Sequence, residues 1–110
     1  MTHVEIFKRN NQIYKIVCDG HTGYGVAGED ICCASLSSVV QTAVLGLMMV
    51  AGVNVELERD EKRGYLSAEI VEELDGERQI QANAILDTMF CGIADLNDGF
   101  SYFIELEVKS

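Results

Sequence analysis

The stretch from Ile31 to Val53 carries no charged residue, and this feature constrains the fold more than any other. It exceeds the about 20 residues that a helix needs to cross a bilayer. Its first half nevertheless contains serine, threonine and glutamine, and the residues that flank it are acidic rather than basic. We therefore predict a helix that is apolar all round and lies at the centre of a globular domain, with no membrane partner.

The rest of the chain must supply the apolar surface that this helix packs against. With 110 residues, of which 48% are hydrophobic, residues 1–110 have the size and composition of one domain. A domain this small buries a modest fraction of its surface, so we expect a homo-oligomer. The net charge of -10 and the scattered lysines and arginines predict no binding to nucleic acid.

The cysteines indicate a reducing compartment. The chain has four, and two of them, Cys32 and Cys33, are adjacent. The chain also starts without the basic and then apolar segment of a signal peptide. We therefore expect thiols rather than disulfides, and a location in the cytoplasm.

Apolar periodicity and turn residues predict an α+β fold. Asn10 and Asn11 suit the tight turn of a hairpin, and Gly52 marks the end of a helix. The predicted elements are strands over 2–8 and 12–18, a helix from Asp30 to about Ala51, strands over 53–58 and 65–70, a helix over 77–97 and a strand over 101–108. This ββαββαβ order predicts a five-stranded sheet and two helices in a two-layer sandwich.

The same alternation predicts which side chains face the core. In the third strand these include Leu57, and on the second helix they include Met89 and Ile93. In the last strand they are Tyr102, Ile104, Leu106 and Val108.

Residues 20–37 hold a strand end, a glycine-rich loop and a helix start, which together can bring reactive side chains close. Cys33 lies in the first turn of the helix predicted to begin at Asp30, where the helix dipole favours a thiolate. His21 is suited to take the thiol proton and later protonate a leaving amine. Amides of that turn, including that of Cys33, would stabilise an oxyanion, and no cofactor or metal is needed. From these residues alone, a catalytic and a purely structural cysteine both remain open.

The segment resembles the signature of a known family, the ribosomal-processing cysteine proteases called Prp. The shared pattern over residues 20–37 is GHxGYGxxGxDIxCAxxS, and His21 and Cys33 fall on the family's catalytic histidine and cysteine. The chain departs from the family pattern at two positions, because Thr22 replaces a usual alanine and Cys32 a usual aliphatic residue. Neighbours in a helix point about 100° apart, so only one of the two cysteines can face His21, and the resemblance implies Cys33.

Further positions have supporting roles in this interpretation. Gly20, Asp30 and Ser37 match characteristic positions of the family. Asp30 either caps the helix or also orients the site, and Ser37 lies one turn beyond Cys33. A loop that closes over the substrate is predicted to contain Gly23, Tyr24, Gly25 and Gly28.

The resemblance implies an endopeptidase that removes a short N-terminal extension from large-subunit ribosomal protein twenty-seven, with the ribosomal precursor as partner and a homodimer as the assembly. Two other functions stay open. Cys18 and His21, with Cys32 or Cys33, would supply ligands to a metal-binding module. Alternatively, the acidic chain would bind a basic ribosomal protein without catalysis.

Overall fold

The computed structural model describes residues 2–20 and 27–110. In this part of the chain it contains five strands and two helices in the predicted order. The elements are β1 (Thr2–Arg9), β2 (Gln12–Asp19), α1 (Ala27–Met49), β3 (Val55–Asp60), β4 (Tyr65–Ile70), α2 (Gly76–Gly99) and β5 (Ile104–Lys109). The strands form one sheet in the order β3-β4-β2-β1-β5, in which β1 and β5 are parallel and the other neighbours are antiparallel.

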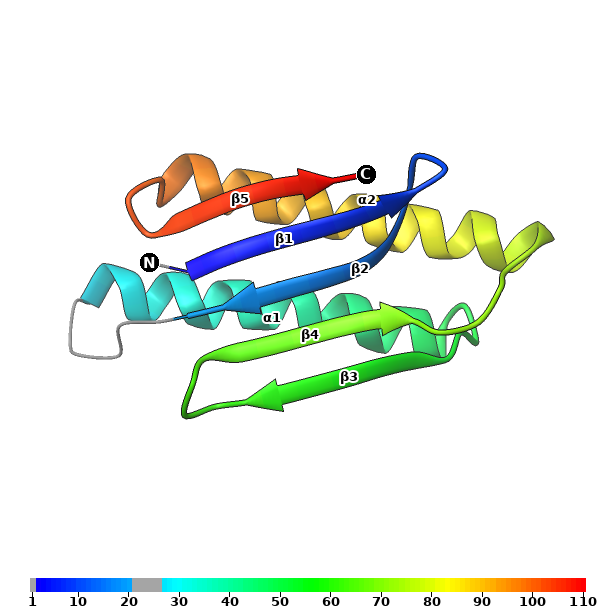
Figure 1. Cartoon of the computed structure of the whole chain (residues 1–110), viewed down its shortest axis with the longest axis horizontal. Helices are drawn as coiled ribbons and strands as arrows, with labels where there is room; N and C mark the ends of the chain where they lie inside the picture. Colours follow the sequence, from blue (N-terminus) through cyan, green and yellow to red (C-terminus); the bar gives the residue numbers. More distant parts are fainter. Residues whose placement is uncertain (1, 21–26) are drawn as a thin grey trace.

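Both helices cover the same face of this sheet and lie behind the strands in the view of Figure 1. The predicted two-layer α+β architecture is therefore confirmed. The turn between β1 and β2 also matches the prediction, because Asn10 and Asn11 have positive φ values of 53° and 61°. Asparagine tolerates this left-handed backbone better than most residues do.

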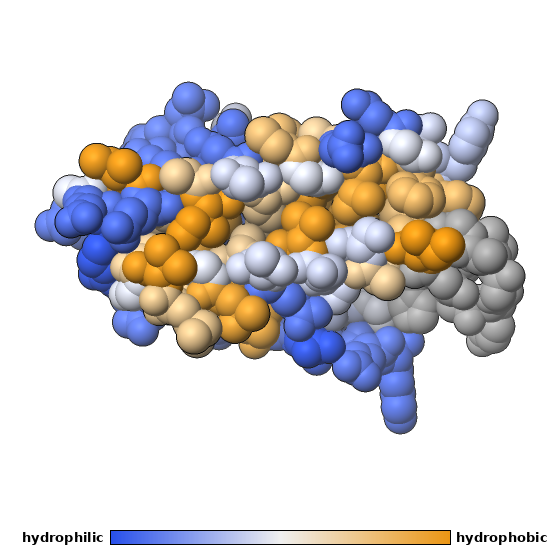
Figure 2. Space-filling model, turned by 180° about the vertical axis from the view of Figure 1, so that it is seen from behind, coloured by the Kyte–Doolittle hydropathy of each residue, from blue (hydrophilic) through white to orange (hydrophobic). Residues whose placement is uncertain are grey.

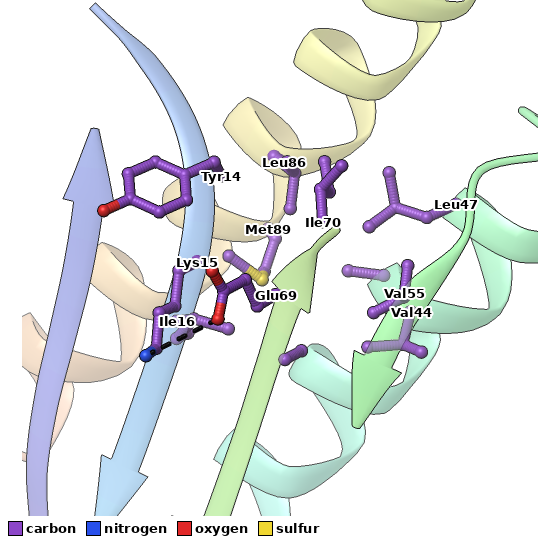
Figure 3. A pocket seen from close by; sticks show the side chains of 12 residues that line it. Tyr14, Lys15, Ile16, Val44, Leu47, Val55, Glu69, Ile70, Leu86 and Met89 are labelled. Atoms are coloured by element: carbon purple, nitrogen blue, oxygen red, sulfur yellow. Dashed lines mark ion pairs between the residues drawn. The ribbon is translucent and has the colours of Figure 1, made fainter. Parts of the chain in front are cut away.

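The core lies between the helices and the sheet. Figure 3 shows Val44 and Leu47 from α1 and Leu86 and Met89 from α2 directed at side chains of the strands, among them Ile70. A free volume of only about 10 Å³ remains between these side chains. This part of the molecule is therefore packed core rather than a binding site.

The charge-free stretch forms α1, and it packs through one face. Leu36 and Val40 are buried against the sheet, whereas Leu45 and Met49 are 56% and 79% exposed. Figure 2 shows apolar side chains spread over this helical side of the molecule. By length and composition, Ile31–Met49 would suffice to cross a membrane, and 33% of the stretch is buried in the fold. The helix therefore covers the sheet on one side and leaves an apolar surface on the other, instead of being enclosed all round as predicted.

The core prediction is wrong on the two edge strands and in the turn before β5. Leu57 on β3 is 42% exposed and Val108 on β5 is 46% exposed, because an edge strand has a neighbour on one side only. Tyr102 is 87% exposed because it precedes β5, in a turn that the bond from the Phe103 amide to the Phe100 carbonyl closes at 2.8 Å. The predicted core positions Met89 and Ile93 on α2 are buried.

Candidate active site

A pocket lies at the end of the sheet where β1 starts and β2 ends, and it contains Cys33. Its free volume is about 320 Å³. The residues that line the pocket lie on α1 and on or next to β1, β2, β3 and β4. They are Thr2, Cys18, Gly20, Cys33, Ala34, Leu36, Ser37, Arg59, Glu61, Gly64 and Leu66. A volume of this size accommodates one or two side chains of a peptide.

The sulfur of Cys33 is in contact with the first residue of β1. Thr2 Oγ1 lies 3.4 Å from Cys33 Sγ, and the same hydroxyl donates a hydrogen bond of 2.8 Å to the Gly20 carbonyl. Gly20 follows β2 with a φ of 98°, a backbone conformation that glycine adopts easily. Two segments of the sheet and helix α1 thus meet at the Cys33 sulfur.

The adjacent cysteines differ in their access to this pocket. Cys32 is 0% exposed and belongs to the hydrophobic core, whereas Cys33 is partly exposed and lines the pocket. A nucleophile must be able to reach the carbon that it attacks. Of the two sulfurs, Cys33 therefore has the position that the chemistry requires, whereas Cys32 is packed in the core.

A second thiol, Cys18 at the end of β2, lies deep in the same pocket. Burial, and to a smaller extent negative charge on nearby Cys33, raise the pKa of the Cys18 thiol to about 12. Cys18 therefore stays protonated at neutral pH and does not compete with Cys33 as a nucleophile.

Two polar residues of the pocket lining, Ser37 and Arg59, are connected by hydrogen bonds through Gln41. Gln41 Nε2 donates to Ser37 Oγ at 2.6 Å, and Arg59 Nη1 donates to Gln41 Oε1 at 3.3 Å. Arg59 also forms an ion pair with Glu61 at 2.9 Å. Ser37 thus lines the same pocket as Cys33, as predicted. Arg59, on the edge strand β3, brings a positive charge to this pocket.

The start of α1 differs from the prediction. The helix begins at Ala27, so Asp30 is its fourth residue and Gly28 its second, and neither residue precedes the helix. Ala27 and Glu29 favour helix, and α1 extends over them although Gly28 between them does not favour it. Cys33 therefore lies in the second turn, and its amide is not among the first four that lack a partner within the helix. The prediction that Cys33 lies in the first turn is therefore wrong, and the dipole effect on its sulfur is weaker than in the first turn. The oxyanion role of its amide stays a prediction.

Several predicted site residues fall on the segment between Gly20 and α1. His21, Gly23, Tyr24 and Gly25 lie outside the described residues. The metal-binding alternative includes His21; among residues 2–20 and 27–110, no three histidine, cysteine or acidic side chains converge as a metal site.

Sequence reasoning missed Thr2 and Arg59. Thr2 lies next to Gly20 because β1 and β2 pair with His3 opposite Asp19. The hairpin turn at Asn10 sets the register only as far as Lys8, because the register shifts between Phe7 and Lys8. The sequence therefore indicates that the start of β1 lies near the end of β2, but not that Thr2 lies next to Gly20. The sequence contains no signal for Arg59, because its position depends on how β3 and β4 are arranged beside β2.

Comparison with known proteins gives consistent matches along the chain. A family model described as cysteine protease Prp matches residues 1–105. The ribosomal processing cysteine protease Prp of Bacillus subtilis (strain 168) is 31% identical over 74 residues, which are 67% of this chain and 66% of that protein. The protein of the same name from Staphylococcus aureus (strain Mu50) is 24% identical over 98 residues, 89% of each chain.

A solved structure has the same fold. It is a crystal structure of the ribosomal processing protease Prp from S. aureus in complex with a substrate peptide. The TM-score is 0.85 with 22% sequence identity, and the match covers 99% of this chain and 100% of that one. At this identity the likeness establishes the common fold.

Proposed function

The chain belongs to the Prp family of ribosomal-processing cysteine proteases, and on this premise we propose that it removes a short N-terminal extension from large-subunit ribosomal protein twenty-seven. The observation that best supports this proposal is the sulfur of Cys33, which lines a pocket of about 320 Å³ while the adjacent Cys32 is buried. The net charge of -10 suits a basic substrate protein. We also propose that the enzyme works in the cytoplasm, where thiols stay reduced.

The proposed mechanism uses Cys33 and His21 as a catalytic pair. His21 takes the thiol proton, and the sulfur attacks the scissile carbonyl carbon to form a tetrahedral intermediate. When the carbon–nitrogen bond breaks, His21 gives the proton to the leaving amine and a thioester remains on Cys33. Water, deprotonated by His21, then hydrolyses the thioester and restores the thiol.

Other residues support these steps in the proposal. Ser37 lines the pocket together with Cys33, and the hydrogen bond from Gln41 fixes its hydroxyl. Asp30, the fourth residue of α1, keeps the supporting role that the family pattern gives it. The loop residues Gly23, Tyr24 and Gly25 would close over the substrate.

Cleavage of an extended ribosomal precursor tests the function directly. The purified protein should convert the precursor into two products, and mass spectrometry should locate one cut between the extension and the mature protein. A precursor without its extension serves as the control and should stay intact. Binding of the precursor without any cut would contradict the proposal and would favour the acidic interaction domain instead.

We propose a homodimer that forms through the outer face of α1. This face exposes Leu45 and Met48, and an apolar groove of about 510 Å³ lies beside it between α1 and α2, with Gly46 and Ile85 among its lining residues. Two acidic chains repel each other, but the stretch from Ile31 to Val53 has no charge and can meet a second copy without that penalty.

A charge on α1 should therefore dissociate the dimer. Leu45→Glu is expected to lower the mass measured by light scattering from two chains to one, because the glutamate would have to be buried in an apolar interface. Val108→Glu, at an exposed position on the edge strand β5, is the matched control and should leave the dimer intact. If Val108→Glu dissociated the dimer and Leu45→Glu did not, the interface would lie at the sheet edge, which would contradict the proposal.

A further inference from the structure

Thr2 is a buried polar residue at the start of β1, in contact with the proposed nucleophile. Its side chain is 4% exposed, and Ser67 is the other buried polar residue in the described part of the chain. Thr2 Oγ1 lies 2.8 Å from the Gly20 carbonyl oxygen and 3.4 Å from Cys33 Sγ. Its backbone amide is bonded to the Phe103 carbonyl at 2.8 Å, which fixes the position of the residue.

The number of hydrogens at this contact is limited. A threonine hydroxyl has one hydrogen, and a carbonyl oxygen can only accept, so the bond to Gly20 uses the hydrogen of Thr2. The Cys33 thiol must then be the donor in the 3.4 Å contact. This arrangement therefore requires the Cys33 sulfur to carry its hydrogen.

The contact must change when Cys33 loses its proton. A thiolate has no hydrogen to donate, and it would face a lone pair of the Thr2 oxygen. Hydrogen bonds to a charged acceptor are about twice as strong as those between neutral groups. Rotation of the Thr2 hydroxyl from the Gly20 carbonyl to the sulfur is therefore favourable once the thiolate exists.

We propose that Thr2 stabilises the thiolate of Cys33 by turning its hydroxyl hydrogen from the Gly20 carbonyl to the sulfur. The Gly20 carbonyl belongs to the peptide unit that continues into His21. The same rotation therefore links the charge state of the nucleophile to the backbone that carries the proposed base. This role rests on the proposed function only in that Cys33 is the nucleophile.

Alkylation with iodoacetamide near neutral pH tests Thr2 without any peptide substrate. The thiolate forms a sulfur–carbon bond and iodide leaves, so the rate follows the thiolate population. Thr2→Val keeps the shape of the side chain and removes the hydroxyl, and it should slow alkylation of Cys33 by about tenfold. Thr2→Ser keeps the hydroxyl and should stay within about twofold of the natural protein. Peptide mapping by mass spectrometry measures the extent of alkylation at each cysteine, with the exposed Cys91 as internal reference.

Precursor cleavage is measured on the same variants. Thr2→Val should lower kcat by a similar factor with KM nearly unchanged, because the contact acts on the sulfur rather than on substrate binding. Ser67→Ala, which removes a buried hydroxyl that does not line the pocket, is the control for a general loss of stability and should change neither rate.

The two experiments separate this inference from the proposed function. Equal alkylation rates of Cys33 in Thr2→Val and the natural protein would overturn the role of Thr2, whether or not the precursor is cut. Slower alkylation in Thr2→Val, together with an uncut precursor in the natural protein, would uphold Thr2 and reject the ribosomal substrate.

Discussion

Replacing Cys33 with alanine is expected to abolish cleavage of the ribosomal precursor, whereas the same replacement at Cys32 should leave most of the activity. The loss at Cys33 should be at least about a thousandfold in kcat, because no other group in the mechanism can form the thioester. Cys32 is 0% exposed in the core, so its loss removes buried volume but no reacting atom. Activity of Cys32→Ala should stay within about threefold of the natural protein at temperatures where it is folded.

This pair of variants is informative because the two cysteines are adjacent on α1. Both changes remove one sulfur from the same helix, so a general effect on α1 would reduce both activities together. The measurement is the initial rate of product formation by mass spectrometry, with circular dichroism as the check that each variant is folded. Retained cleavage in Cys33→Ala, or a folded but inactive Cys32→Ala, would contradict Cys33 as the nucleophile.

The element order and the central packing could be predicted from sequence because they depend on local patterns. The turn at Asn10 and Asn11 and the apolar face of α2 are determined by residues that are close in sequence. Strand order is different: nothing in the alternation of β5 indicates that it pairs in parallel with β1. For the same reason, periodicity predicted that Leu57 and Tyr102 face the core, although one lies on an edge strand and the other in a turn.

The candidate site likewise has residues that local sequence predicts and residues that only the fold brings together. The sequence predicted Cys33 and Ser37 as neighbours because they are one helical turn apart, and the structure has both at one pocket. Thr2 is 31 positions from Cys33, and its contact with the sulfur depends on how β1, β2 and α1 pack together. Local pattern is therefore enough to propose Cys33 as the nucleophile, whereas the contact of Thr2 with its sulfur can only be found from the fold.

The packing of α2 on the sheet should account for a large part of the stability of the domain. Ile93 on α2 is 0% exposed, whereas Ile80 on the same helix is 70% exposed. Removing buried methyl and methylene groups loses their transfer free energy and leaves a cavity. The same change at an exposed position loses little, because the side chain is already in water.

Ile93→Ala is therefore expected to lower the free energy of unfolding by about 3 kcal/mol, and Ile80→Ala by less than about 0.5 kcal/mol. A domain of this size is stable by about 5–15 kcal/mol, so the first change removes a large share of the total. Urea unfolding followed by circular dichroism measures both values, at one protein concentration so that a shift in dimerisation does not enter the comparison. Both variants make the same change on the same helix, so only burial differs between them. Similar losses would therefore contradict the conclusion that α2 buries Ile93 and exposes Ile80.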